Sequence, residues 1–316
     1  MRIGVTGGSG FVGKYLINEL LKSQHQVNAL SRRKRKNNDS GLIWYEGDIN
    51  DEDSLSYFLK DCDVVCNCAG EITDSKNYTR NNVNGVKVLH NASIKSGVNL
   101  FIQLSSAGIY KVPIQGKVHE DSEIYAYDEY ERSKINAEKW LFDQKKMNVI
   151  ILRPTTVYGA DMPNQSLKNL FSAILNDRFF FIGSKKAVSC YISVENLTDA
   201  ILKVIEKREE INFGGTYCEA FNISDDLNYY NFINLACRSL SVKPTSIRIP
   251  LRLILFLLKL NKSSLNINIP LTEKGARSLA KQSTFSSKKF RTNFSWKHRF
   301  PHSETIDNCI KEWFEI

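Results

Sequence analysis

The feature that most constrains this chain is a glycine-rich turn close to its first residue. A short apolar segment, residues 2–6, is followed by Gly7, Gly10 and Gly13, and then by apolar residues at helical spacing. Between a strand and a helix, the first glycine permits a tight turn, the second lets a pyrophosphate approach the backbone, and the third allows close packing. The N-terminus of the following helix offers free N–H groups and a positive dipole to phosphate. The pattern therefore predicts a dinucleotide site, with a plain glycine turn as the alternative.

Strand-like and helix-like segments alternate along the first half of the chain. The predicted strands are residues 2–6, 27–30, 42–45, 64–68, 100–104 and 149–152, and the predicted helices include 51–60, 81–96 and 127–145. Such alternation is typical of parallel βαβ units, and apolar runs without strict alternation fit strands covered on both faces. We therefore expect an α/β fold: a Rossmann-type doubly wound parallel sheet with a smaller mixed α/β C-terminal substrate domain.

The pattern loosens after Pro154, and this change predicts the domain organisation. At about 150 residues per domain, 316 residues suffice for roughly two units. The expected division is a dinucleotide-binding domain at 1–158, to which segment 187–212 returns, and a substrate-binding domain at 159–186 and 213–316. In the latter, residues 250–260 predict an apolar helix that packs within the domain; an oligomer contact or loose attachment to a membrane surface is the alternative.

The composition excludes several classes of protein. Hydrophobic residues make up 42% and charged residues 24%, which is ordinary for a globular chain. The net charge of +9 favours anionic ligands, but the basic segment 272–299 carries no nucleic-acid recognition motif and is expected to be solvated surface. Seven cysteines without a CxxC pair and five scattered histidines indicate neither a disulfide framework nor a metal site. We expect a cytoplasmic protein without a signal peptide or an integral membrane segment.

The end of the second predicted strand bears on the choice of cofactor. NAD-binding versions of this motif usually place a carboxylate there to hold the ribose 2′-hydroxyl. This chain has Ser31, Arg32 and Arg33 instead, so a 2′-phosphate would meet two guanidinium groups. NADP(H) is therefore favoured over NAD(H), unless the two arginines merely open a basic solvated loop.

A tyrosine and a lysine stand four residues apart in a predicted helix. Tyr130 and Lys134 consequently share one helix face. A free phenol has a pKa near 10, and a neighbouring ammonium group would lower it and produce a usable acid–base group. Ser105 and Ser106 follow a predicted strand and supply a hydroxyl for a substrate carbonyl or alcohol. Alone, a Tyr–Lys pair is a common coincidence; with the glycine turn and the serines it predicts a catalytic site.

With these pieces together, the chain resembles the extended short-chain dehydrogenase/reductase superfamily, in particular its NAD-dependent epimerase/dehydratase family of nucleotide-sugar enzymes. The matching motifs are TGGSGFVG (6–13), GDI (47–49), NCAG (67–70), NNVNG (81–85), LSSAGIY (104–110), YERSK (130–134), LRPTTVYG (152–159) and YISVENLTDA (191–200). The resemblance implies Ser106, Tyr130 and Lys134 as catalytic residues. The cofactor-binding residues it implies, with those from the glycine turn and the second strand, are Gly7, Gly10, Phe11, Val12, Gly13, Ser31, Arg32, Arg33, Asp48, Ile49, Cys68, Ala69, Gly70, Asn81, Tyr130, Lys134 and Thr155.

The chain departs from the family pattern at three places. Residues 106–108 are Ser-Ala-Gly where the 4,6-dehydratases carry Thr-Asp-Glu, so the extra acid and base of dehydration are missing. Thr156 stands where sugar epimerases have an asparagine that contacts the nucleotide diphosphate. Ser189 replaces a common arginine, so anion binding would pass to other cations, for which the candidates are Lys185, Lys186 and Arg277.

These observations predict an NAD(P)-dependent oxidoreductase or epimerase that acts on a sugar carbon, with an extended-family epimerase and a 4-ketoreductase equally compatible. The expected partner is a small-molecule substrate, a nucleotide sugar, and the expected assembly is a homodimer that binds no nucleic acid. Two alternatives are a reductase of a non-sugar ketone, which Thr156 and Ser189 favour, and a non-catalytic NAD(P)-binding regulator.

Overall fold

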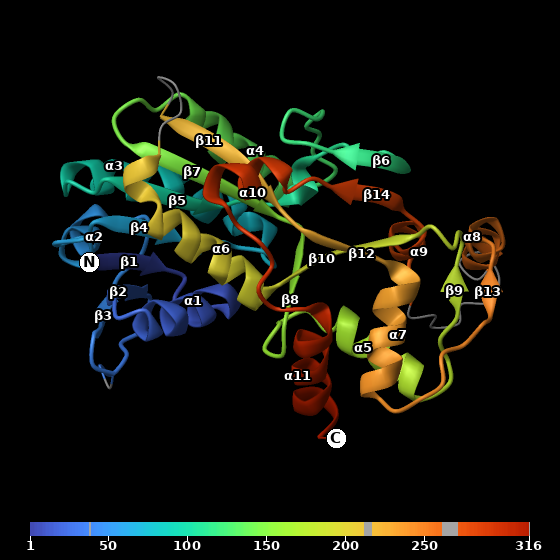
Figure 1. Ribbon diagram of the computed structural model, residues 1–316. Coiled ribbons are helices and arrows are strands. Elements are labelled where there is room, and N and C mark those ends of the chain that lie inside the picture. Colours follow the sequence, from blue (N-terminus) through green and yellow to red (C-terminus); the bar gives the residue numbers. More distant parts are fainter. Residues whose placement is uncertain (38, 212–216, 261–270, 316) are drawn as a thin grey trace.

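The computed structural model describes residues 1–37, 39–211, 217–260 and 271–315. At its centre lies a seven-stranded parallel sheet with the strand order β11-β7-β5-β4-β1-β2-β3 (Figure 1). The strands are β1 (Arg2–Thr6), β2 (Gln26–Ser31), β3 (Leu42–Glu46), β4 (Val64–Asn67), β5 (Leu100–Leu104), β7 (Asn148–Pro154) and β11 (Cys218–Ile223). The predicted α/β fold with a doubly wound parallel sheet is confirmed.

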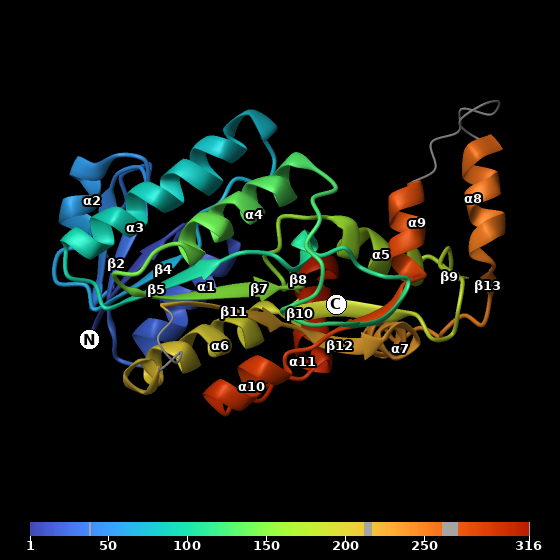
Figure 2. The same ribbon diagram turned by 90° about the horizontal axis from the view of Figure 1, so that it is seen from above.

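Helices cover both faces of this sheet (Figure 2). One face carries α1 (Phe11–Lys22), α6 (Val194–Glu206) and α10 (Lys288–Phe294); the other carries α2 (Glu52–Phe58), α3 (Gly85–Lys95) and α4 (Glu129–Phe142). Neighbouring residues of one strand enter different cores: Cys66 packs with the first set of helices and Val65 with the second. Burial on both faces explains why these strands are apolar without alternation.

The smaller part of the molecule lies at the end remote from β2 and β3 (Figure 1). It holds three small sheets, with the orders β12-β10-β8, β13-β9 and β14-β6. Their strands are β6 (Gln115–Val118), β8 (Thr156–Tyr158), β9 (Phe181–Ile182), β10 (Val188–Ser193), β12 (Asp225–Asn228), β13 (Arg248–Ile249) and β14 (Gln282–Phe285). The accompanying helices are α5 (Ser166–Leu175), α7 (Tyr229–Ser239), α8 (Leu251–Leu260), α9 (Glu273–Leu279) and α11 (His302–Phe314).

The large sheet takes in a segment that the sequence assigned to the smaller domain. Strand β11 pairs in parallel with β7 from Cys218 opposite Val149 to Ile223 opposite Pro154. Helix α10 covers it, with Phe294 packed edge-on against Phe221 at 5.3 Å between ring centres. The expectation that all of 213–316 lies outside the nucleotide-binding unit is therefore wrong for β11 and α10, because their apolar side chains join the core of the large sheet. Residues 212–216 of the expected boundary lie outside the described residues.

The predicted apolar helix at 250–260 is α8, and one of its faces packs against other described residues. Ile254 is buried, whereas Leu253, Phe256 and Leu257 are exposed.

Among the described residues, no helix combines the length and the hydrophobicity that a membrane span requires. All seven cysteines have free thiols.

Candidate active site

The glycine turn brings three backbone segments into contact. Gly7 has a φ of +63°, a conformation that favours glycine, and its carbonyl accepts a hydrogen bond from the amide of Gly10 at 2.9 Å. A Cβ on Gly13 would lie 2.1 Å from the carbonyl oxygen of Gly7, and one on Gly7 would lie 2.6 Å from the backbone of Cys68. Strand β1, helix α1 and the loop after β4 thus meet without intervening side chains, which leaves a backbone cradle that fits a pyrophosphate.

A first cavity opens at the carboxyl ends of the central strands. Strand β1 lies between β2 and β4 in the sheet, so the connections from β1 and β4 leave in opposite directions at this point, the usual ligand site of such sheets. The residues that line the cavity are Gly7, Ser9, Gly10, Leu30, Ser31, Arg32, Gly47, Asp48, Ile49, Cys68, Ala69, Gly70, Glu71 and Asn81. The structure therefore brings together ten of the residues that the sequence assigned to cofactor binding, and adds Ser9, Leu30, Gly47 and Glu71.

Two of the predicted cofactor residues turn their side chains elsewhere. The ring of Phe11 packs edge-on against Tyr15, 5.8 Å between ring centres, and also touches Gly159. The side chain of Val12 packs against the sheet core. Both residues stand in the first turn of α1, which has no side-chain cap, so only their backbone N–H groups remain for a phosphate.

The arginines after β2 surround a hollow beside the first cavity. It is lined by Ser9, Ser31, Arg32, Arg33 and Arg35. The amide of Arg33 donates to the hydroxyl of Ser31 at 3.2 Å, and the guanidinium of Arg35 lies 4.9 Å from the ring centre of Trp44. The described residues that line this hollow include three guanidinium groups and no carboxylate, which favours an anion. Arg35 is an additional cation beyond the predicted Arg32 and Arg33.

A second cavity of about 290 Å³ lies between the large sheet and the smaller part of the molecule. Its lining residues are Ser106, Ala107, Gly108, Val112, Pro154, Thr155, Thr156, Val188, Ser189, Cys190, Tyr191, Tyr229, Ser278, Leu279, Lys281, Ser283 and Phe285. Predicted residues Ser106 and Thr155 are both here. The wall combines small hydroxyl side chains with aliphatic and aromatic groups, as a site for a partly polar organic substrate requires.

A lysine that the sequence did not single out supplies the charge in this wall. Among the described residues that line the second cavity, Lys281 is the one that is charged. Its carbonyl accepts from the amide of Val188 at 2.9 Å, which places it beside Ser189. The three expected cations do not line the cavity, and Arg277 instead pairs with Glu273 at 2.8 Å. The cavity wall therefore favours Lys281 over Lys185, Lys186 and Arg277 for anion binding, because the contact between β14 and β10 brings a more distant lysine to that wall.

The tyrosine and the lysine of α4 face the ends of β4 and β5. Asp128 caps α4 by accepting from the amide of Glu131 at 2.9 Å, which fixes the first turn that carries Tyr130. Lys134 is only 7% exposed; its Nζ donates to the carbonyl of Leu104 at 3.2 Å and lies against Gly70. Gly70 lines the first cavity, and Ser106, to which Tyr130 is hydrogen-bonded, lines the second. Tyr130 and Lys134 thus contact a lining residue of each cavity but are not themselves among the residues that line either one.

The pKa values of Tyr130 and Lys134 are shifted mainly by burial. Burial raises the pKa of Tyr130 to about 12, although a hydrogen bond with Ser106 acts in the opposite direction. Burial also lowers the pKa of Lys134 to about 8. The Nζ of Lys134 lies 5.8 Å from the ring centre of Tyr130. The expected lowering of the phenol pKa by the ammonium group is therefore not found in this structure, because desolvation dominates and the ammonium is directed at Leu104.

A buried chain of amides, which the sequence analysis missed, leads from the glycine turn to Lys134. The hydroxyl of Thr6 donates to Asn67 at 2.5 Å, and the amide of Asn67 donates to Gln103 at 2.8 Å. The amide of Gln103 then donates to the same Leu104 carbonyl that Lys134 contacts, at 2.7 Å. Polar residues at the last positions of otherwise apolar strands were the available signal, since a buried polar side chain requires a partner.

The loop after β4 is tied to α4 by an asparagine next to the predicted one. Asn81 lines the first cavity, as expected, but Asn82 is 2% exposed. Asn82 accepts from the amide of Glu71 at 2.8 Å and donates to the hydroxyl of Ser133 at 3.0 Å. Both asparagines belong to a π-helical turn (Thr79–Asn84), a rare element that is often found at functional sites.

Comparison with known proteins agrees with this geometry. Residues 3–223 match the model of the NAD dependent epimerase/dehydratase family. UDP-glucose 4-epimerase of Vibrio cholerae is 33% identical over 237 residues, 70% of either chain, and sterol-4-alpha-carboxylate 3-dehydrogenase (decarboxylating) of Dictyostelium discoideum is 29% identical over 224 residues, 64% of this chain and 67% of that one.

Solved structures agree with this assignment. The crystal structure of UDP-glucuronic acid 4-epimerase from Bacillus cereus in complex with NAD superposes with a TM-score of 0.76 at 19% identity, over 100% of this chain and 99% of that one. At this identity the superposition shows the shared fold, while the family model and the curated relatives carry the family assignment. The chain belongs to the NAD-dependent epimerase/dehydratase family, an extended short-chain dehydrogenase/reductase type of enzyme.

Proposed function

We propose that the protein transfers hydride between a nicotinamide cofactor and a sugar carbon of a nucleotide sugar, as an epimerase or a 4-ketoreductase. The observation that supports the proposal is a pair of contacts made by one helix: Lys134 lies against Gly70 of the first cavity, and Tyr130 is hydrogen-bonded to Ser106 of the second. The first cavity has the backbone cradle for a pyrophosphate, and the second has a mixed wall with one cation. The bound cofactor would donate or accept the hydride.

The side chains of the chain itself would handle the proton and the positions of the reacting groups. Ser106 and Tyr130 would hold the carbonyl or alcohol oxygen of the substrate, and the Tyr130 hydroxyl would give or take its proton. Lys134 would hold the nicotinamide ribose and stabilise the phenolate as it forms. Lys281 would bind an anionic part of the substrate, such as a diphosphate.

The arginine hollow supports NADP(H) over NAD(H). Arg32, Arg33 and Arg35 face a space next to Ser31, where a ribose 2′-phosphate would project from the first cavity. Two solved structures of this fold whose titles name UDP-glucuronic acid are NAD complexes, so this chain would differ from them in cofactor preference.

The nature of the substrate has two candidates. The Vibrio cholerae relative is named for UDP-glucose, and this favours a nucleotide sugar. The Dictyostelium discoideum relative is named for a sterol carboxylate, and the aliphatic and aromatic part of the second cavity keeps a non-sugar ketone as the second candidate. A non-catalytic regulator is disfavoured because Tyr130 and Lys134 are both in place. We also propose that the protein forms a homodimer and that it is divided into a nucleotide-binding unit and a substrate-binding unit.

The test is to purify the protein, identify any cofactor that accompanies it, and assay it with UDP-glucose, UDP-galactose and a sterol 4-carboxylate. Tightly held NAD with interconversion of the two UDP-sugars indicates an epimerase. An empty protein that oxidises NADPH only with a 4-keto sugar nucleotide indicates a reductase. Turnover of the sterol alone would overturn the sugar assignment.

A further inference from the structure

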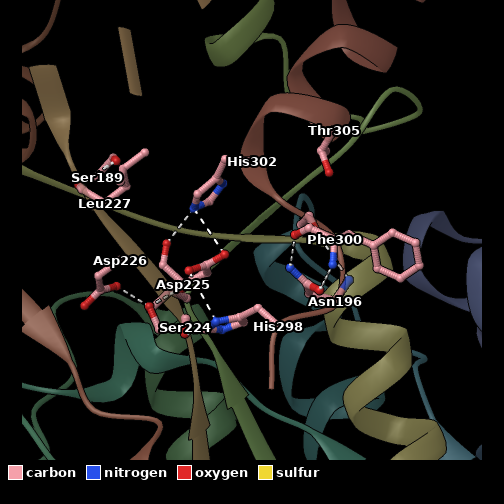
Figure 3. Close-up of polar contacts among 12 residues, drawn as sticks. Ser189, Asn196, Ser224, Asp225, Asp226, Leu227, His298, Phe300, His302 and Thr305 are labelled. Carbon is pink, nitrogen blue, oxygen red and sulfur yellow. Dashed lines mark hydrogen bonds and ion pairs between the residues drawn. The ribbon is translucent and has the colours of Figure 1, made fainter. Parts of the chain in front are cut away.

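A partly buried polar network lies where β11 ends and β12 begins, next to the second cavity. Figure 3 shows two neighbouring carboxylates that point in different directions. Asp225 is directed at two imidazoles, with 3.4 Å to Nδ1 of His298 and 3.4 Å to Nε2 of His302. Asp226 instead accepts from the hydroxyl of Ser224 and, with its other oxygen, from the amide of Phe285.

The hydrogen bonds of this network have only one consistent direction. A serine hydroxyl has one proton, and an ionised carboxylate only accepts, so the proton of Ser224 is committed to Asp226. The hydroxyls of Ser224 and Thr155 are 3.1 Å apart. Because Ser224 has no second proton, Thr155 must donate to it. The Thr155 hydroxyl then has only lone pairs left for the second cavity, whose wall it joins.

We propose that Asp226 is a positioning residue that, through Ser224, makes Thr155 a hydrogen-bond acceptor for the carboxamide N–H of the nicotinamide ring. This proposal rests on the proposed function, since hydride transfer beside Ser106 requires the nicotinamide in the cavity that Thr155 also lines. The carboxamide is a suitable partner because its NH₂ group can only donate.

Protonation of Asp226 would reverse the chain of hydrogen bonds. Its second oxygen still accepts from the Phe285 amide, so the oxygen that faces Ser224 is the better place for the new proton. Ser224 would then donate to Thr155, which would leave Thr155 one free lone pair instead of two and would free its proton to turn toward the carboxamide donor. Burial and the adjacent Asp225 raise the pKa of Asp226 to about 6, although Ser224, Phe285 and the Cys190 thiol of β10 oppose them with hydrogen bonds. The reversal therefore falls in an accessible pH range.

The substitution Asp226→Asn should impose the reversed direction at every pH. Its carbonyl oxygen can keep the Phe285 amide, which leaves the NH₂ group to donate to Ser224. Thr155→Val removes the hydroxyl and Thr155→Ser retains it. Asp177→Asn is the matched control, because Asp177 lies apart from the network, with a φ of +55° that asparagine also adopts readily.

The experiment is calorimetric titration of the full chain with NAD and with 3-acetylpyridine adenine dinucleotide, which lacks the carboxamide NH₂, from about pH 5 to about pH 8. NAD is preferred to NADP as a probe because a 2′-phosphate titrates near pH 6 itself. For the unaltered protein we expect NAD affinity to fall about tenfold below pH 6. Asp226→Asn should show the weak affinity throughout, Thr155→Val should lose the transition, and Thr155→Ser and Asp177→Asn should keep it. The acetylpyridine analogue should show no transition.

Several results would overturn the proposal. It is wrong if Asp226→Asn binds NAD like the unaltered protein at pH 8, if the transition survives in that variant, or if the analogue shows the same transition. Should Asp226→Asn fail to fold, the comparison of Thr155→Val with Thr155→Ser decides. Failure of the proposed function is distinguishable, because the unaltered protein would then either bind neither dinucleotide or bind NAD without turning over a sugar nucleotide in the assay described above.

Discussion

The side-chain nitrogen of Lys134 donates a hydrogen bond to the main-chain carbonyl of Leu104 at the end of β5. The same carbonyl accepts from the side-chain amide of Gln103, which in turn accepts from Asn67. These buried amides fix the carbonyl that positions the ammonium group of Lys134. Its position next to Gly70 gives it access to the first cavity, and its helix neighbour Tyr130 is bonded to Ser106 of the second.

Replacement of this lysine should therefore affect binding and turnover together. Lys134→Ala removes a cation that serves both the ribose and the phenolate, and we expect cofactor affinity to fall about 10- to 150-fold, since hydrogen bonds to charged groups contribute roughly 1.5–3 kcal/mol. Turnover at saturating cofactor should fall as well. The measurement is cofactor titration followed by kcat, with exposed Lys139→Ala on the same helix as control. A loss confined to affinity would contradict the catalytic part of the assignment.

Replacement of Tyr130 should reduce turnover without weakening cofactor binding. Tyr130→Phe retains the ring and removes the proton that catalysis requires, so we expect kcat to drop at least about 10²-fold while cofactor affinity stays nearly unchanged. Steady-state assays and cofactor titration separate the two effects. The exposed Tyr127→Phe is the control. Activity within about tenfold of the unaltered protein would show that Tyr130 is not the acid–base group.

The charge in the second cavity allows a test of substrate class. Lys281→Gln retains most of the side-chain volume and removes the cation, so binding of UDP should weaken by about tenfold or more and become much less dependent on salt. NAD affinity should not change. Lys186→Gln, at an exposed position outside the cavity wall, is the control. Equal UDP affinity in the protein with and without Lys281 would point to an uncharged substrate.

Cofactor preference should follow the arginine hollow. Arg32→Ala/Arg33→Ala should weaken NADP(H) by about 10- to 150-fold for each guanidinium that binds the 2′-phosphate, and NAD(H) far less, because NAD(H) has no phosphate at that position. Titration of both cofactors against both proteins is the measurement, and the exposed Arg238→Ala on α7 is the control. If the unaltered protein prefers NAD, or if both affinities change equally, the epimerase becomes the better assignment.

A buried ion pair should dominate the stability of the region behind the site. Arg153 and Glu138 are almost fully buried and approach to 2.6 Å, and Arg153 also donates to the hydroxyl of Tyr110 at 2.6 Å. Glu138→Ala leaves the guanidinium charge without its partner, so the free energy of unfolding should fall by about 3–5 kcal/mol. Urea denaturation measures this, and the exposed Glu129→Ala on the same helix should change stability little. An equal effect of the two substitutions would contradict the predicted role of the pair.

The sequence predicted those features that depend on neighbours along the chain. The spacing of Gly7, Gly10 and Gly13 and the Tyr–Lys interval on α4 each follow from the geometry of one turn or one helix, and the parallel sheet follows from the alternation of strands and helices. Contacts between distant segments could not be predicted in this way. Lys281 reaches the cavity only because β14 lies beside β10.

The direction of individual hydrogen bonds could not be predicted from the sequence either. Thr155 meets Ser224 across 69 positions, and the direction of their bond depends on Asp226. The orientation of Lys134 likewise depends on a carbonyl 30 positions away. A pattern of residue types contains neither the packing that joins these segments nor the burial that shifts the pKa of Tyr130.

The path of β11 and α10 limits how this protein can be divided or recombined. A fragment that ended at residue 158 would lack β11, α6 and α10, and would expose β7 as a sheet edge together with the apolar face that Phe221, Ile201 and Phe290 now cover. Exposed strand edges of this kind promote aggregation. An exchange of substrate specificity between relatives must therefore replace two or more separate stretches of sequence at once, because a single crossover point would leave one unit with half of its core.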